Sequence, residues 1–333
     1  MNVRYLWIGA VASGVVSLSV PAVWASQTAK SPAKTSTSAA TKAHANAKNT
    51  NTTTKAQTAK PSAALVAQAA KAYAAAVQNL AQAPYLQMSD IQKTVATFQL
   101  TKLGKKTSSV ASQLGPTNDV ERDHAKADAT NATQPIIWYQ SVDQSLGNST
   151  NLQVGSRFFS LNGKTWVTNN ANVYSVVNML TLRDVPPFDS FVNPQITKVG
   201  SNYDIRGVVN VAKYFAKDKS ETIAMNLVYP SLNGSALTTF LSHIREVDNV
   251  VLKKVGQSYV VSKDAASDKM IIPVDIFALM EGVSPATLSK YFTTRNVNDA
   301  GVVWYSYGKA PVSLPSQVQK DLGKKTVTGT VYG

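Results

Sequence analysis

The stretch Gln153-Val-Gly-Ser-Arg-Phe-Phe-Ser-Leu-Asn-Gly-Lys-Thr-Trp-Val-Thr168 contains the hairpin signal that decides the class of fold. Asn162-Gly163 lies between two runs of strand-forming residues and adopts the positive φ angles of a two-residue type I′ turn at low cost. Such a turn places Phe159 opposite Trp166 on one face of the strand pair and Phe158 on the other. Because both faces are apolar, we expect a layer of protein or a bound ligand to cover each side.

Further runs of alternating or strand-forming residues predict the rest of a sheet. Gly256-Gln257 and Gly308-Lys309 suit two-residue hairpin turns, because each pair begins with glycine. The charged and small residues from Val120 to Ala129 indicate an exposed edge strand or a loop, and 103–118 indicates a long loop. The other expected strands cover 94–100, 135–139, 203–211, 222–229, 250–263, 269–279 (with Pro273 marking an edge or a bulge) and 302–315.

One amphipathic helix is expected between Pro61 and Pro84, because apolar residues recur there at helical spacing. Shorter helices are expected over 173–182, 234–247, 284–293 and 316–322. A long N-terminal helix, then strands joined by tight turns, with short helices inserted late, predicts an α+β domain with a curved, mostly antiparallel sheet. The apolar stripe of the first helix consists of Leu65, Ala69, Tyr73, Val77 and Leu80.

The first 25 residues have the layout of a secretory signal peptide. Arg4 provides the positive n-region, an uncharged and mostly apolar run follows, and Val23-Trp24-Ala25 offers small residues for cleavage after Ala25. The uncharged run to Ala29 is long enough to span a bilayer, so an uncleaved N-terminal anchor is the alternative. Both alternatives place the rest of the chain outside the cytoplasm, secreted or associated with the cell envelope.

Residues 26–61 form a basic linker of Ala, Thr, Ser and Lys, which we expect to be disordered because it cannot bury enough apolar surface. Its six lysines make it either a solvated spacer or an electrostatic tether to an anionic wall polymer or a membrane surface. We expect a single domain over 62–323 and a tail over 324–333.

The composition limits the chemistry that the protein can perform. The absence of cysteine excludes disulfides, thiolate metal sites and cysteine nucleophiles. Charged residues make up 16 % of the chain and its formal charge is +14, whereas soluble domains typically contain about 25 % charged residues. Few carboxylates and a high pI fit an acidic external medium, because little stability is then lost when carboxylates protonate.

No catalytic or cofactor motif stands out in the sequence. The three histidines, His44, His124 and His243, have no partner at metal-ligand spacing, and no nucleophile elbow, phosphate loop or zinc-protease motif occurs. The carboxylates are scattered along the chain and cannot be paired from the sequence. We therefore expect a non-enzymatic protein without cofactor or metal. No motif of interleaved basic and aromatic residues indicates nucleic-acid binding.

Two hairpins carry a resemblance to a known group of extracytoplasmic proteins. Tyr305-Ser-Tyr307-Gly308-Lys309, followed by Pro315, is similar to the closing strands of the LolA/LolB/LppX-like fold, and Arg157-Phe-Phe-Ser-Leu-Asn-Gly-Lys-Thr-Trp166 is similar to an early hairpin of the same fold. The resemblance covers roughly Ser62 to Leu322. It implies a half-open antiparallel barrel whose concave apolar face holds a lipid or an acyl chain and is covered by helices.

The candidates for lining such a site are aromatic residues and one methionine on the expected strands. They form either ordinary core or, where the apolar strand faces exceed what the few helices can cover, a ligand cavity. We predict an exported binding protein that holds a lipid, an acyl chain or a lipidated partner on the concave face of the sheet. The alternative is a structural or interaction module at the cell wall, tethered by the linker. The candidate residues are Phe159, Trp166, Tyr203, Met225, Tyr229, Tyr259, Trp304 and Tyr307.

Overall fold

The structure is a computed structural model that describes most of the chain beyond the linker. The predicted signal peptide, nearly all of the predicted linker, and the helix expected over 173–182 lie outside the described residues. The described ranges are 61–131, 134–144, 147–155, 157–169, 185–217, 225, 229–309 and 311–323.

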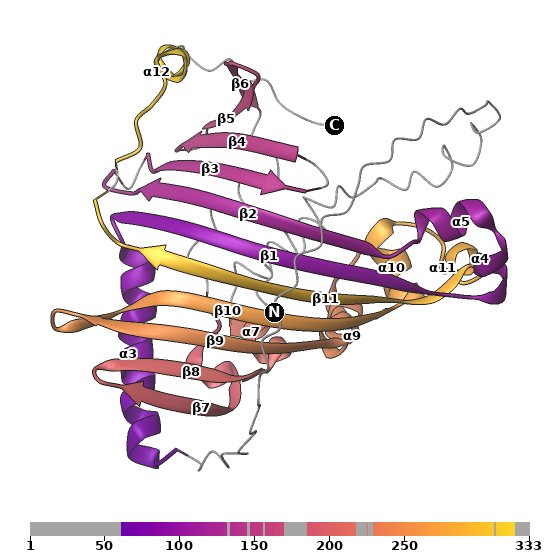
Figure 1. Cartoon of the computed structure of the whole chain (residues 1–333), viewed down its shortest axis with the longest axis horizontal. Coiled ribbons are helices and arrows are strands. Elements are labelled where there is room, and N and C mark those ends of the chain that lie inside the picture. The colour runs from indigo at the N-terminus through magenta and orange to yellow at the C-terminus, as the bar shows by residue number, and fades with distance from the viewer. Residues whose placement is uncertain are drawn as a thin grey trace, which may run out of the picture.

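The described strands form one antiparallel sheet: β1 Tyr85–Leu100, β2 Thr117–Asp128, β3 Ile136–Asp143, β4 Gly147–Val154, β5 Arg157–Asn162, β6 Thr165–Asn169, β7 Phe191–Val199, β8 Asn202–Val209, β9 Ile244–Val255, β10 Ser258–Pro273 and β11 Phe292–Ser306. Their order is β6-β5-β4-β3-β2-β1-β11-β10-β9-β8-β7 (Figure 1). Two meanders are therefore joined where the first strand pairs with the last. Because β6 and β7 remain edges, the curved sheet is not closed. This confirms the α+β class with a half-open antiparallel sheet.

The helices pack near the two ends of the long strands: α3 Ala63–Gln82, α4 Lys102–Lys106, α5 Ser108–Gln113, the 3-10 turn η1 Phe188–Ser190, α7 Val211–Lys217, α9 Gly234–Ser242, α10 Val274–Glu281, α11 Pro285–Leu288 and α12 Ser316–Leu322. Helix α3 crosses one end of the strands, and α4, α5, α10 and α11 lie at the other end (Figure 1). We call the sheet face that α3 contacts the inner face and the opposite face the outer face. No helix in the described ranges has the length and hydropathy that a bilayer span requires.

Helix α3 forms because its sequence supplies a cap and an apolar stripe. The side-chain oxygen of Ser62 accepts the N–H of Leu65 at 3.2 Å, which satisfies one of the free donors at the helix start. The predicted stripe is confirmed, since Ala69, Tyr73 and Leu80 are buried. The predicted start at Pro61 is wrong by two residues, because Ser62 is the cap and the helix begins after it.

The opening hairpin forms as β5 and β6, with its turn one residue later than predicted. Asn162 pairs with Thr165, so Gly163-Lys164 are the two turn residues. Gly163 has φ of +62° and Lys164 has no positive φ, which is the pattern of a type II′ turn. This turn needs positive φ only at glycine, whereas type I′ would also impose it on asparagine. Phe159 therefore lies opposite Thr168, and Trp166 lies opposite Leu161. Since Phe159 and Leu161 are two residues apart in β5, their side chains point to the same face, so Phe159 and Trp166 still share one face.

Three predictions for the region after α3 are wrong. Strand β1 begins at Tyr85 rather than at 94, and the loop predicted over 103–118 contains helices α4 and α5. Strand β2 is neither an edge strand nor a loop, because it lies between β1 and β3. Its alternating charges suggested solvent exposure, but the carboxyl side chains of Glu121 and Asp123 point to the inner face and are buried.

The second meander follows the predicted strands with shifted ends. Strand β8 and the hairpin turn at Gly256-Gln257 are confirmed, with Gly256 at φ of +59°. The helix predicted over 234–247 ends at Ser242, because β9 takes the chain into the sheet from Ile244. The strand predicted over 269–279 ends at Pro273, which lies at the cap position of α10. Strand β10 lies between β9 and β11, but Pro273 itself pairs only with Thr294 of β11, because the pairing with β9 ends at Met270; its position on an unpaired side of the ladder agrees with the predicted edge.

The third hairpin does not form. Strand β11 already pairs with β1 on one side and with β10 on the other, so residues 311–315 find no free edge of it and are not a strand. The helix predicted over 316–322 is confirmed as α12, and the helix predicted from Ser284 ends at Leu288.

The strand predicted over 222–229 is contradicted at the residue that can be checked. Met225 is helical, and its carbonyl oxygen accepts the N–H of Tyr229 at 2.8 Å. Residues 222–224 and 226–228 lie outside the described part of the chain.

The buried apolar residues gather in three clusters. The α3 cluster lies between α3 and the sheet and includes Tyr73. The helix-end cluster packs α7, α9, α10 and α11 on the other end of the strands and includes Phe277 and Phe292. The C-terminal cluster joins Phe159 of the opening hairpin to Val318 of α12. The opening hairpin is therefore covered by the C-terminal segment of the chain.

Candidate functional site

A band of carboxyl groups crosses the middle of the inner face, between the α3 cluster and the helix-end cluster. Six neighbouring strands contribute to it, from β3 to β9 in the sheet order. Each of these side chains is at most 6 % exposed. They are nearly half of the 19 acidic residues of the chain. We call the following residues the acidic belt: Asp90, Glu121, Asp123, Asp143, Glu246, Asp248, Asp264, Asp268 and Asp299.

The register of the sheet places several belt residues directly opposite one another on adjacent strands. Directly opposed side chains in an antiparallel pair have Cβ atoms roughly 4.5–5.5 Å apart, and like charges at such positions destabilise the pair. The belt cannot therefore be fully ionised without strong repulsion. The directly opposed groups are Asp90 with Asp123, Glu121 with Asp143, and Asp268 with both Glu246 and Asp299.

Burial raises the pKa of several belt residues, so that part of the belt is protonated near neutral pH. It raises the pKa of Glu121 to about 9, with the charge of Asp123 adding to the effect. Burial likewise raises the pKa of Asp123 and of Asp299 to about 7, and that of Asp268 to about 6. The hydroxyl of Ser141 donates to Oε1 of Glu121 at 2.5 Å. A protonated carboxyl group can both donate and accept hydrogen bonds, so neighbours in the belt can satisfy one another.

The belt is arranged in rows along the strands and does not converge on a point. Within the described ranges, no group of three or more His, Cys, Asp or Glu residues has the geometry to hold a metal ion. The sequence analysis missed the belt because it treated the carboxylates as scattered. The signal was present in Glu121-x-Asp123 and Glu246-x-Asp248, since alternate residues of a strand point to one face.

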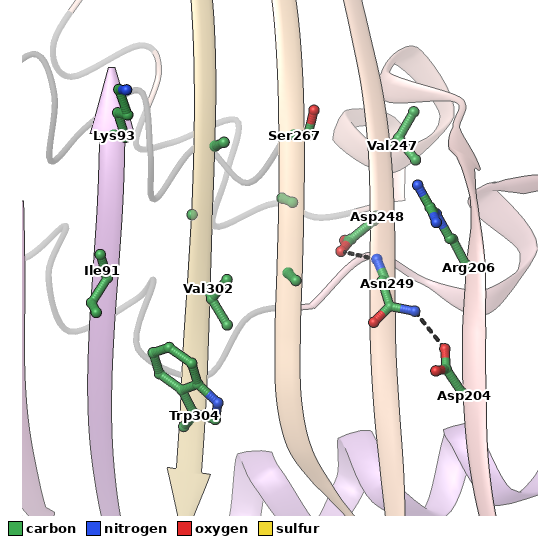
Figure 2. A pocket seen from close by; sticks show the side chains of 14 residues that line it. Ile91, Lys93, Asp204, Arg206, Val247, Asp248, Asn249, Ser267, Val302 and Trp304 are labelled. Carbon is green, nitrogen blue, oxygen red and sulfur yellow. Dashed lines mark hydrogen bonds between the residues drawn. The ribbon is translucent and has the colours of Figure 1, made fainter. Parts of the chain in front are cut away.

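An open groove of about 810 Å³ lies on the outer face, over the same strands whose inner face carries the belt (Figure 2). It crosses β1, β11, β10, β9 and β8, so that it spans about 19 Å at the usual strand spacing. Small residues form its floor where the strands pass beneath it. The outward-facing residues that line it are Ile91, Lys93, Asp204, Arg206, Val247, Asn249, Ala265, Ser267, Ala300, Val302 and Trp304.

The two sides of the groove differ in polarity. Ile91, Val302 and Trp304 lie together over β1 and β11 (Figure 2). Trp304 is 42 % exposed and Ile91 is 43 % exposed, so both present apolar surface to the groove. On the other side, the side-chain amide of Asn249 donates to the carboxylate of Asp204 (Figure 2). Arg206 follows Asp204 on the same face of β8. The groove can therefore accept a molecule with an apolar part and a polar part.

The eight residues predicted to line a ligand cavity do not come together. Trp304 is the member of the set that lines the groove. The others pack in the three apolar clusters: Tyr203, Tyr259 and Tyr307 in the α3 cluster, Met225 and Tyr229 in the helix-end cluster, and Phe159 and Trp166 in the C-terminal cluster. That these seven residues contact a ligand stays a prediction.

The sequence analysis did not single out the other groove residues. Ala265, Ala300 and Val302 are small or medium residues that carry no chemical signal on their own. Their common position becomes visible only through the register, which places Val302 beside both Ile91 and Ala265. Alternation along each strand could have assigned Ala265 and Val302 to the face opposite Asp264 and Asp299, but it does not show which strands lie side by side.

No protein family model matches the chain, and no curated protein matches it. Among solved structures, the chain is similar to lipoprotein LppX from Mycobacterium tuberculosis, with 8 % identity and a TM-score of 0.36 over 76 % of this chain and 98 % of that one. It is similar to LprF from Mycobacterium bovis, with 9 % identity and a TM-score of 0.36 over 75 % of this chain and 97 % of that one. A LolA superfamily protein from Nitrosomonas europaea matches with 10 % identity and a TM-score of 0.22 over 74 % of this chain and 96 % of that one.

At such identities and TM-scores these likenesses carry no argument about the function of this chain. The functional proposal therefore depends on the residues of this chain.

Proposed function

We propose that this chain is an exported, non-enzymatic binding protein that holds an apolar ligand, such as a lipid acyl chain, against its sheet. The observation that carries the proposal is the groove on the outer face, with exposed Trp304 and Ile91 at one side and an apolar floor. Exposed apolar surface of this kind on a soluble domain is typical of a binding site. The signal-peptide layout of the first 25 residues supports a location outside the cytoplasm.

The proposal differs from the sequence-based prediction in the place of the ligand. That prediction put the ligand on the face that the helices cover. The described residues of the inner face form packed clusters and the acidic belt, whereas the groove lies on the outer face. An apolar chain gains little by lying along carboxyl groups, since burying them without hydrogen-bond partners is costly. The outer groove is therefore the better place for an apolar chain.

The size of the groove sets the affinity that we expect. A fully buried methylene contributes about 0.8 kcal/mol, so a chain of about 14 methylenes with half of its surface covered gains roughly 6 kcal/mol. This corresponds to a dissociation constant of some tens of micromolar. We therefore expect measurable binding in solution, with affinity that grows with chain length.

The test is the binding of a fluorescent fatty acid to the purified chain and to two variants. Ala265→Glu places a carboxylate on the groove floor, and we expect it to weaken binding by at least tenfold. Ile271→Glu is the matched control, because Ile271 lies on the same strand and face, is 56 % exposed and does not line the groove. We expect the control to bind within twofold of the parent chain.

Two outcomes would contradict the proposal. One is an absence of saturable binding to the parent chain. The other is equal loss of binding in Ala265→Glu and Ile271→Glu, which would mean that any added negative charge on the sheet has the same effect. Circular dichroism of each variant checks that the sheet is intact.

A further inference from the structure

The two faces of the sheet differ in the ionisable residues that they carry: buried carboxyl groups on one and basic side chains on the other. On the strands from β2 to β8 in the sheet order, the inner face holds the acidic belt, whereas the outer face holds exposed lysines and arginines. Those nearest the groove are Lys93, Arg122, Arg206, Arg245 and Lys269, together with the half-buried Lys263. The register fixes their common face, since Arg122 pairs with Ile91, Lys263 with Trp304, and Lys269 with Arg245. The carboxylates on this face of these strands are Asp204 and Asp128.

Exposed apolar side chains lie among these cations. Ile271 is 56 % exposed, Ile91 43 % and Trp304 42 %, and all three lie on the outer face. Tryptophan favours the boundary between water and hydrocarbon, because its ring is apolar while its N–H remains hydrogen-bonded. The six strands place this surface over about 24 Å at the usual strand spacing. Such a surface is wide enough to contact several lipid headgroups at once.

We infer that the outer face of the sheet docks on an anionic lipid bilayer, with the cations on the headgroups and with Trp304 and Ile91 at the hydrocarbon boundary. A basic face with interspersed apolar side chains is the pattern that anionic membrane surfaces attract. An anionic soluble polymer would match the cations but would leave the exposed Ile271, which lies on this face outside the groove, without an apolar partner. The bilayer matches both features.

This inference goes beyond the proposed function and can fail independently of it. The groove opens on the docking face, so a docked protein would present its apolar side to the lipids. Binding of a fluorescent fatty acid needs no membrane, whereas docking needs no occupied groove. The two properties are therefore measured separately, each with its own variants.

The test compares the chain from Ser26 onward, which lacks the apolar N-terminal run, with two triple variants of the same length for binding to vesicles of phosphatidylglycerol and phosphatidylcholine. Arg122→Gln, Arg245→Gln and Lys269→Gln remove three exposed charges from the docking face outside the groove. Each basic residue near an anionic surface contributes about fivefold in affinity, so we expect the triple variant to bind about 100-fold more weakly. The basic linker is the same in all variants and so cancels from the comparison.

The matched control removes three exposed lysines elsewhere: Lys71→Gln on α3, Lys105→Gln on α4 and Lys290→Gln after α11. The net charge of this variant equals that of the first triple variant. We expect its vesicle affinity to stay within threefold of the parent chain. An equal loss in both triple variants would overturn the inference, because binding would then depend on net charge alone.

The apolar contact is tested with brominated lipids, which quench tryptophan fluorescence at the hydrocarbon boundary. We expect quenching in the parent chain and its loss in Trp304→Phe. If Trp304 is not quenched while polyphosphate competes the protein off the vesicles, the face binds anions in general, and the inference is overturned. Vesicles of phosphatidylcholine alone should bind neither the parent chain nor the variants.

Discussion

The acidic belt predicts that this fold is most stable in acid and loses stability as the pH rises. Asp299 provides the cleanest case. Its oxygens accept bonds from the amide of Gln92 at 3.0 Å and the hydroxyl of Thr94 at 3.0 Å, and its side chain is 4 % exposed. Burial, with the nearby charge of Asp268, raises its pKa from the ordinary 3.8 to about 7.

The sign of the effect follows from proton binding. Between pH 4 and pH 7, the folded state holds a proton on Asp299 that the unfolded state has lost, so the stability falls as the pH rises through this window and levels off above it. One pKa unit corresponds to about 1.4 kcal/mol, so the complete effect of Asp299 is ~4 kcal/mol. Because Asp268 can take up a proton in its place, we expect about 2–4 kcal/mol to be measured.

The perturbation is Asp299→Asn, which keeps the acceptor oxygen for Gln92 and Thr94 but cannot ionise. We expect little change in Tm at pH 4. At pH 8.5 we expect the variant to melt roughly 8 °C above the parent chain, since a domain of this size shifts by about 2–4 °C for each kcal/mol. The assay is thermal unfolding by circular dichroism across this pH range, with urea unfolding as a second measure.

The control is Asp275→Asn, which changes an exposed carboxylate at the start of α10. We expect this control to leave the pH dependence of Tm unchanged. The reasoning would be refuted if Asp299→Asn raised Tm equally at pH 4 and pH 8.5, or lowered it at pH 8.5. A fold that is most stable when its belt is protonated also agrees with the composition, since few carboxylates and a high pI fit an acidic external medium.

Two further predictions test the packing. Gly104→Ala would push a Cβ atom into the carbonyl oxygen of Tyr291, so we expect the free energy of unfolding to fall by about 3 kcal/mol or more in urea unfolding. Gly308→Ala is the control: its Cβ would meet nothing within 4 Å, so it should leave the stability unchanged. Tyr73→Phe removes the hydroxyl that donates to the carbonyl of Pro186 at 2.5 Å, so we expect a loss of about 1–3 kcal/mol, and an unchanged Tm would contradict this hydrogen bond.

Local signals in the sequence were sufficient for the first helix and for two turns. The buried stripe of α3 follows from the helical spacing of its apolar residues. The turns at Gly163 and Gly256 follow from the ability of glycine to adopt positive φ. Even there, the turn at Gly163 moved by one residue, because type II′ places positive φ only on glycine. Element ends were harder to predict, since β9 and β11 gain residues by pairing with distant strands that no local window contains.

The third hairpin illustrates why local signals can mislead. Residues 302–315 contain strand formers and a glycine turn, but the long-range partners of β11 are β1 and β10. Once both of its edges are paired, the following segment cannot join it. The candidate site was also only partly predictable: Trp304 was identified as an aromatic strand residue, while its neighbours in the groove depended on the register.

The period-two alternation by itself determined which residues share a face of the sheet. It grouped Glu121 and Asp123 of β2 on one side and Arg122 and Lys126 on the other, and it separated Glu246 and Asp248 of β9 from Arg245 in the same way. Only the tertiary structure decided which side is inside. For an isolated strand it is reasonable to expect Glu121 and Asp123 to face solvent, because ionised carboxylates favour water. In this fold the apolar ends of the same strands must face α3 and the helix-end cluster, and the rigid alternation of the strand carries the carboxyl groups inward with them.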